Sequence, residues 1–186
     1  MIEAKIDSIR VSLMTQQRVV ILKDLTAERY LPIWIGPFEA DAIALELQEV
    51  PVSRPLTHDL LRNVLVELGA QVMHVFINDL RDDTYYARIV LDVNGRHAEI
   101  DCRPSDAIAL AVRVRTRIFV DDGVMERAAV TLDGAALEGG SEGSGREHPE
   151  ELGSGGPSPD DERLSVFRDF INSLDLDDLD RPREER

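Results

Sequence analysis

Apolar and polar residues alternate with a period of two from the N-terminus of the chain, as is typical of a β-strand. The apolar side chains occupy even positions up to Ile6 and odd positions from Ile9 onward. Because a one-residue slip turns every side chain to the other face, a single strand over residues 2–13 requires a β-bulge between these two positions. Apolar runs at 18–23 and 30–35 predict two more strands. Three strands therefore precede the first helix.

Helical spacing of apolar residues begins directly after this third strand. The Gly-Pro pair at 36–37 opens a helix that we expect to end near Gln48, because proline at the first helical position lacks only an N–H that would have no partner. A second helix is predicted to start with Thr57 as its N-cap and to end at Gly69.

A tight hairpin is predicted in the second half of the domain. Asn94-Gly95 is the strongest two-residue hairpin signal in the sequence. If these two residues form the turn, Asp92 faces His97 and Arg88 faces Asp101, so opposite charges meet across the hairpin. The other elements predicted are strands at 72–77, 84–92, 96–101 and 118–120 and helices at 103–115 and 124–129.

The pentapeptide Asp-Ala-Ile-Ala-Leu occurs twice without change, at 41–45 and at 106–110, an offset of 65 residues. Each copy lies at the start of a predicted helix, follows a predicted strand and has a proline just upstream. The repeat indicates a duplicated strand-strand-helix unit. Two such units pack most simply about a pseudo-twofold axis, with their helices on one antiparallel or mixed sheet, so the expected fold class is α+β.

The composition changes after residue 130. Residues 1–130 contain 15 Lys/Arg and 20 Asp/Glu, a net charge of −5, whereas residues 131–186 contain 6 and 16, a net charge of −10. The second segment also holds 8 of the 12 glycines. We expect one domain over 1–130, a flexible Gly-rich acidic linker over 131–160, and an acidic C-terminal helix or tail over 161–186 that docks on the domain or on a partner.

Charge and motifs narrow the possible functions. A net charge of −15 opposes a broad polyanion-binding surface, so any contact with nucleic acid must be local. One cysteine, no secretory signal and no run of about 18 apolar residues predict a cytoplasmic protein without a membrane span. The sequence has no Gly-rich phosphate loop, Ser-centred elbow, dinucleotide fingerprint or basic stripe with interleaved aromatic residues, which argues against kinases, NTPases, elbow hydrolases and RNA platforms.

Both aspartates of the repeat, Asp41 and Asp106, fall on an otherwise apolar helix face. One interpretation is capping, in which each accepts backbone N–H bonds in the first turn and complements the helix dipole. A second is that both carboxylates converge near the pseudo-axis and hold a divalent cation. A third is a contact between subunits.

Four sequence blocks follow one another within the first 130 residues: Leu31-Pro32-Ile33 with residues 35–40, residues 54–61, residues 79–82 with 85–88, and residues 103–110 with 118–120. Together they resemble the bifunctional nuclease domain family of small bacterial and plant proteins. The resemblance implies an oligomeric α+β domain with nuclease activity on DNA and RNA. The chain departs from the family pattern at Trp34, at Cys102 and at 115–117, where Arg-Thr-Arg replaces a Gly-containing turn.

Metal-assisted hydrolysis of a phosphodiester needs carboxylates that hold Mg²⁺ or Mn²⁺, a base that activates the nucleophile, and a cation near the phosphorane charge. The candidate metal ligands are Glu39, Asp41 and Asp106. The candidate substrate-binding residues are Arg54 and Arg103. The candidate catalytic residues are Asp41, His58, Asp59 and Asp106.

Each candidate has a structural alternative. Glu39 shares an exposed helix face with Glu46 and is then solvated, and His58 is then a neutral, hydrogen-bonded imidazole at a helix start. Arg54 and Arg103 are each placed to pair with a carboxylate such as Asp41 or Asp106. Cys102, beside Arg103, would be a nucleophile of lowered pKa but has no histidine at a recognisable spacing.

Two functions from different classes follow from the sequence. The first is a nuclease that hydrolyses DNA or RNA with the help of Mg²⁺ or Mn²⁺, acts as a homodimer or higher homo-oligomer, and repels non-specific substrate through its acidic tail. The second is a non-catalytic regulatory or interaction protein whose core forms a homo-oligomer and whose terminal helix captures a partner.

Overall fold

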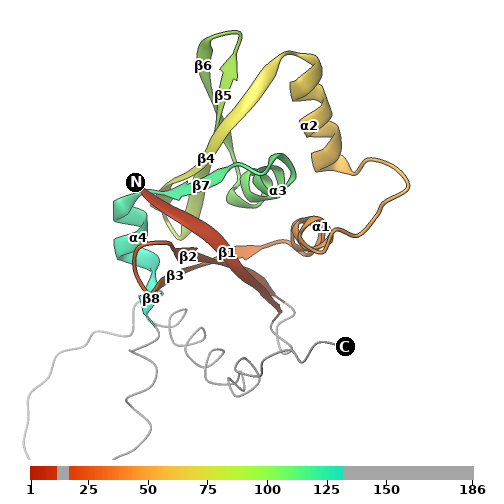
Figure 1. Ribbon diagram of the computed structural model, residues 1–186. Helices are drawn as coiled ribbons and strands as arrows, with labels where there is room; N and C mark the ends of the chain where they lie inside the picture. The colour runs from red at the N-terminus through yellow and green to blue at the C-terminus, as the bar shows by residue number, and fades with distance from the viewer. Residues whose placement is uncertain (12–16, 132–186) are drawn as a thin grey trace, which may run out of the picture. The chain divides into compact units, whose positions relative to one another are not determined.

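The computed structural model describes residues 1–11 and 17–131, and Figure 1 shows their ribbon. The predicted continuation of the first strand to residue 13 lies outside the described residues. The predicted linker at 131–160, except for Thr131, also lies outside the described residues. The same is true of the predicted C-terminal helix or tail at 161–186.

The described residues form one mixed sheet of eight strands in the order β6-β5-β4-β7-β1-β2-β3-β8. Within it, β4 and β7 pair in parallel, and the other neighbouring pairs are antiparallel. The strands are β1 (Ile2–Val11), β2 (Arg18–Asp24), β3 (Arg29–Ile35), β4 (Ala70–Arg81), β5 (Thr84–Val93), β6 (Arg96–Cys102), β7 (Arg117–Val120) and β8 (Val130–Thr131).

Helices of the described part lie on two sides of the strands. In Figure 1, α1, α2 and α3 gather to the right and α4 lies at the left. Among the described residues, no helix is long and apolar enough to span a membrane. The helices are α1 (Pro37–Leu47), α2 (Thr57–Glu67), α3 (Pro104–Val114) and α4 (Asp122–Ala128).

The predicted α+β class with a mixed sheet and packed helices is confirmed. The strands β1-β2-β3 and β4-β5-β6 each form an antiparallel meander, and each meander leads into a helix, α1 or α3, that carries one copy of the pentapeptide. Strand β7 joins the two meanders, because it pairs with β1 on one side and with β4 on the other. The pseudo-twofold relation between the two units stays a prediction.

Two local predictions about the strands are confirmed. The pairing of β1 with β2 shifts register between Ile6 and Ser8, which is the predicted β-bulge. The β5-β6 hairpin has the predicted register, with Asp92 opposite His97. The ion pair across this hairpin differs from the prediction: the Arg88 guanidinium contacts Glu99 at 2.6 Å, a diagonal neighbour, rather than the residue directly opposite.

The helix boundaries follow the proline and glycine signals. Pro37 and Pro104 are the first residues of their helices, and Gly69 ends α2 with a φ of +70°. The prediction of Thr57 as an N-cap was wrong by one residue, because the cap is Leu56. A leucine side chain cannot accept a hydrogen bond, so the carboxylate of Asp59 accepts the Leu56 N–H at 2.7 Å instead.

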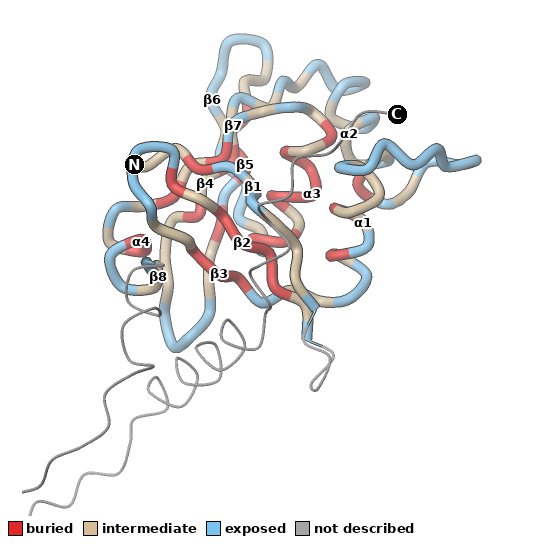
Figure 2. Tube along the Cα trace, turned by 60° about the horizontal axis from the view of Figure 1, so that its bottom comes forward, coloured by how far each residue is buried: buried red, intermediate tan, exposed pale blue. Residues whose placement is uncertain are grey.

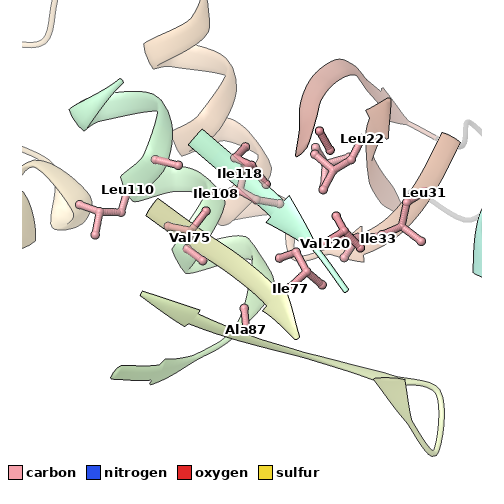
Figure 3. Close-up of a cluster of buried hydrophobic side chains, with 14 of the residues drawn as sticks. Leu22, Leu31, Ile33, Val75, Ile77, Ala87, Ile108, Leu110, Ile118 and Val120 are labelled. Carbon is pink, nitrogen blue, oxygen red and sulfur yellow. The ribbon is translucent and has the colours of Figure 1, made fainter. Parts of the chain in front are cut away.

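The sheet curls so that strands distant in its order meet. The Tyr85 hydroxyl of β5 donates to the Pro32 carbonyl of β3 at 3.1 Å, although four strands separate β5 from β3 in the sheet. Helix α3 is the most buried helix of the described part, as Figure 2 shows, because it packs against both neighbouring helices and the strands. Figure 3 shows the resulting core, which includes Leu22, Leu31, Ile33, Val75, Ile77, Ile108, Leu110 and Val120.

Candidate active site

The first turns of α1, α2 and α3 each carry an acidic residue at the third helical position. These residues are Glu39, Asp59 and Asp106. A carboxylate at this position complements the partial positive charge of a helix N-terminus. Side-chain contacts connect all three turns, so three helix N-termini meet at one place. The positive ends of the three helices stabilise the ionised carboxylates that lie there.

Arg103 links two of these carboxylates. It is the N-cap of α3, and its guanidinium contacts Asp106 in a fork, with Nε at 2.7 Å from Oδ2 and Nη2 at 3.0 Å from Oδ1. The same Nη2 lies 2.8 Å from Oε1 of Glu39 on α1. The Glu39 side chain is only 18% exposed, whereas that of Arg103 is 66% exposed. The alternative of a solvated Glu39 is therefore wrong, because Arg103 covers this carboxylate.

His58, the second residue of α2, completes the cluster. Its ring is buried, and Nε2 lies 3.2 Å from Oδ1 of Asp106. Burial alone would raise the pKa of Asp106, but the hydrogen bonds from Arg103 and His58 outweigh it and lower that pKa below 3.8. Asp106 is therefore ionised at neutral pH and accepts from both partners. We call Glu39, His58, Arg103 and Asp106 the carboxylate cluster.

The structure places Asp41 apart from this cluster. Its side chain is 60% exposed and contacts Arg18 at 3.4 Å, beside a hollow between β1, β2 and α1. Glu39 and Asp41 are two residues apart on α1, so their side chains leave the helix about 200° apart. Among the described residues, Asp41 and Asp106 have no partner in common.

Asp41 lies apart from Asp106 because the two pentapeptides begin at different positions in their helices. The pentapeptides are offset by 65 residues, but the prolines that begin the two helices, Pro37 and Pro104, are offset by 67. Asp41 is thus the fifth residue of α1, whereas Asp106 is the third residue of α3. Glu39 is the positional counterpart of Asp106, and it is Glu39 that shares Arg103 with it.

Asp59 lies next to His58 in the sequence but contacts a different partner. Its Oδ1 accepts from Nε of Arg113 at 2.7 Å, and the Arg113 side chain is 1% exposed. Arg113 also donates to the carbonyls of Ala109 and Ala42, so it connects α1, α2 and α3. Burial raises the pKa of Asp59, but hydrogen bonds from Leu56 N–H and Arg113 lower it overall.

The other candidates stand outside the cluster. Arg54 is exposed and has no hydrogen bond or ion pair with any described residue. Cys102 is not a low-pKa nucleophile, in line with its lack of a histidine partner, because burial and the charges of Asp106 and Asp101 raise the pKa of its thiol to about 11. The ring of His74 packs edge-on against that of Phe119, on β4 and β7.

The residues present fit a divalent cation in a limited way. No group of three or more His, Cys, Asp or Glu side chains among the described residues is arranged to hold a metal. Mg²⁺, however, is commonly held by one or two carboxylates, with water and substrate phosphate completing its shell. Glu39 and Asp106, bridged by one guanidinium, provide two such carboxylates.

Gly36 keeps space for one of them. A Cβ atom at this position would lie 2.2 Å from Oε2 of Glu39, so any other residue would displace the carboxylate. Gly36 and Arg113 are the two residues whose part in this site the sequence did not predict, although Gly36 marked the start of a helix. For Gly36 a signal was present, because the Gly36-Pro37 pair places Glu39 at the third helical position.

Comparison with known proteins identifies the family of the chain. Residues 20–133 match the family model of the bifunctional nuclease domain. The chain is 35% identical over 177 residues to an uncharacterized protein of Mycobacterium tuberculosis, which covers 95% of this chain and 97% of that protein. It is 30% identical over 108 residues to "Bifunctional nuclease 2" of Oryza sativa subsp. japonica, and 27% identical over 120 residues to "Bifunctional nuclease 1" of Arabidopsis thaliana.

The two plant matches cover 56% and 59% of this chain but only 33% and 37% of the plant proteins, so the likeness is to one part of each. The family match contains all four residues of the carboxylate cluster, together with Asp59 and Arg113. The chain therefore belongs to the bifunctional nuclease domain family.

Proposed function

We propose that this protein is a nuclease that hydrolyses phosphodiester bonds of DNA or RNA with a divalent cation, Mg²⁺ or Mn²⁺, at the carboxylate cluster. The observation that carries the proposal is the contact of a buried histidine with a carboxylate that also shares an arginine with a second carboxylate. A base, a cation and two carboxylates are thus joined by consecutive contacts, from His58 to Asp106, from Asp106 to Arg103 and from Arg103 to Glu39. Family membership and the names of the plant relatives support the same reaction class.

His58 is the proposed general base. An ionised Asp106 only accepts hydrogen bonds, so Nε2 of His58 carries the hydrogen in their 3.2 Å contact. In the neutral imidazole the lone pair is then on Nδ1, the atom that takes a proton from the attacking water. Asp106 fixes the ring orientation and stabilises the imidazolium that forms.

Arg103 is the proposed phosphate contact. Its guanidinium already spans two carboxylates, and its side chain is exposed enough to turn towards a substrate. A bound divalent cation would supply charge neutralisation at the phosphate and a more acidic water. Glu39 and Asp106 would hold it, and Arg103 would release at least one carboxylate to become a donor to the phosphate oxygens.

The test is turnover of labelled DNA and RNA by the purified chain with Mg²⁺, with Mn²⁺ and with EDTA. We expect His58→Gln and Asp106→Asn each to lower kcat by about 10²–10⁴, while Asp101→Asn, an exposed aspartate on β6, retains wild-type activity. Asp41→Asn is expected to behave like this control. Equal turnover in all variants, or turnover that persists in EDTA, would refute the proposal.

A second candidate function, a regulatory domain that acts as a homo-oligomer, is favoured by one observation. Leu60, Val64 and Leu68 form an exposed apolar stripe along α2. Side chains at this spacing form the ridge that packs helix on helix, as a second copy of α2 would. We expect Val64→Glu to reduce the mass measured by light scattering to that of a monomer. An unchanged mass contradicts this contact.

A further inference from the structure

A group of basic residues lies at the other end of α3 from the carboxylate cluster. A hollow of about 380 Å³ opens between the start of β1, the end of α3 and the start of β7. Three cationic residues line it, Lys5, Arg115 and Arg117, whereas Glu3 is the one acidic residue among its lining. We call this feature the basic hollow.

The cations of the basic hollow are poorly neutralised by the rest of the described chain. Lys5 and Arg117 have no ion pair with a described residue, although Arg117 lies over the ring of Phe119 at 5.4 Å from its centroid. Arg115 has one acid within reach, Glu49 at 4.0 Å, and both side chains are more than 80% exposed. A pair so exposed contributes little.

This is unusual in so acidic a protein. The sequence carries 36 acidic against 21 basic residues. Several other cations of the described part pair closely with acids, as Lys23 does with Glu28 and Arg88 with Glu99, whereas exposed Arg54 and Arg96 have no ion pair with a described residue and lie apart from one another. Unpaired cations gathered around one hollow therefore provide a local site for an anion, the only kind of nucleic-acid contact that the net charge allows.

The floor of the basic hollow is apolar. It includes Ala111 and Val112 of α3, Ile6 of β1 and Ile118 of β7. A free inorganic anion gains nothing from such a floor, whereas a nucleotide presents a charged phosphate together with an apolar sugar and base face. Its volume also lies within the range of about 300–1,000 Å³ typical of ligand pockets.

Helix α3 connects the two sites. Asp106 is the third residue of this helix and Arg115 is its C-cap, nine residues later, which corresponds to about 14 Å along the axis. One strand of B-form nucleic acid advances about 3.4 Å per nucleotide, so this span corresponds to about four nucleotides. Because α3 is buried, a strand follows a longer path over the surface, and about four nucleotides is the shortest stretch at this spacing that joins the two sites.

We infer that the basic hollow is a nucleotide-binding subsite that holds the substrate strand four or more nucleotides from the bond that is cleaved. Lys5, Arg115 and Arg117 contact phosphates, and the apolar floor contacts sugar or base. The inference rests on the proposed nuclease function, because only a bound strand gives the two sites a common ligand.

The backbone of Arg115 offers a variant that separates binding from folding. Arg115 ends α3 in the left-handed region, with φ +54° and ψ +42°, a conformation that favours glycine. Arg115→Gly removes the cation and relieves this conformation at the same time. We expect its melting temperature to equal or exceed that of the wild type while its affinity for oligonucleotide falls.

The experiment measures fluorescence anisotropy of a labelled single-stranded oligonucleotide with the full chain in EDTA, so that no cleavage occurs. The slope of log K against log salt is negative, and each of Lys5→Gln, Arg115→Gly and Arg117→Gln is expected to reduce its magnitude by about 0.7. For the triple variant, the loss of affinity between 50 and 200 mM salt should then be roughly 20-fold smaller than for the wild type. Arg96→Gln, an exposed cation on the distant β5-β6 hairpin, is the matched control.

Wild-type slopes in the three variants, or an equal decrease in Arg96→Gln, would overturn the inference. So would full competition by inorganic phosphate or a mononucleotide at the same phosphate concentration, which would indicate a site for free phosphate compounds. Failure of the proposed function is distinguishable, since it appears as turnover that is insensitive to Asp106→Asn, whatever the binding slopes are.

Discussion

The pair of Asp59 and Arg113 provides the sharpest test of how this site is built. Arg113 is almost fully buried and donates to one carboxylate and to two carbonyls on three different helices. Removing one partner of a buried ion pair typically costs about 3–5 kcal/mol, because the remaining charge stays buried without compensation. Arg113→Met should therefore lower the free energy of unfolding by about that amount, out of about 5–15 kcal/mol for a small domain.

Asp59→Asn is a milder change at the same contact. The amide oxygen still accepts the Leu56 N–H or the Arg113 guanidinium, so the change is from a charged to a neutral acceptor. Because this change leaves the buried Arg113 guanidinium without a counter-charge, the expected loss is about 3 kcal/mol, the lower end of the same range, since the amide oxygen still accepts a hydrogen bond. The double variant should cost less than the sum of the two, because no carboxylate is then left unpaired.

Urea unfolding of the full chain at pH 7, followed by circular dichroism, measures these losses, with Asp101→Asn as the control. The same samples are assayed for nuclease turnover per folded molecule, where Asp59→Asn should stay within about twofold of the wild type, well below the 10²-fold expected for a catalytic group. An Asp59→Asn variant that unfolds at the wild-type urea concentration but loses turnover 100-fold or more would show that Asp59 is catalytic and that its contact with Arg113 is incidental.

Three further predictions concern other residues. Burial raises the pKa of Asp24, but hydrogen bonds from Thr26 and Arg29 lower it below the unfolded value of 3.8. The ionised carboxylate therefore stabilises the fold above pH 3.8, and this stabilisation is lost as the pH falls through the folded pKa. The difference in free energy of unfolding between the wild type and Asp24→Asn should thus shrink between about pH 6 and pH 3. With a pKa of about 11 instead of 9.0, Cys102 should react with iodoacetamide at pH 8 about 100-fold more slowly than an exposed thiol, and a rate equal to that of free cysteine contradicts its burial. Gly36→Ala should weaken activation by Mg²⁺ with little change in melting temperature, because it displaces the flexible Glu39 carboxylate; unchanged Mg²⁺ activation would show that Glu39 is not a ligand.

The sequence predicted most of the local structure because short-range signals determine it. Alternation located the bulge after Ile6, Asn94-Gly95 set the hairpin register, and the prolines marked the starts of α1 and α3. The insertion of β7 between the two meanders had no such signal. Its pairing with β1 depends on contacts between residues more than 100 positions apart, and the three-residue apolar run at 118–120 does not specify its neighbours.

The sequence predicted most of the residues of the carboxylate cluster but not which of them contact one another. His58, Arg103 and Asp106 do lie together, but the identical pentapeptides directed attention to Asp41 as the partner of Asp106. An identical sequence indicates common descent of a segment, whereas the place of a side chain depends on the residue at which its helix begins. Counting from each proline would have selected Glu39.

The insertion of β7 between the two meanders also constrains the order in which the parts of the domain can assemble during synthesis. The N-terminal meander and α1 emerge from the ribosome first, yet β1 gains its second neighbour only when residues 117–120 have been made. Glu39 and Asp106 likewise belong to segments separated by most of the domain, so a late, long-range closure is required before they share Arg103. A chain interrupted before residue 103 therefore has neither the second neighbour of β1 nor an assembled carboxylate cluster.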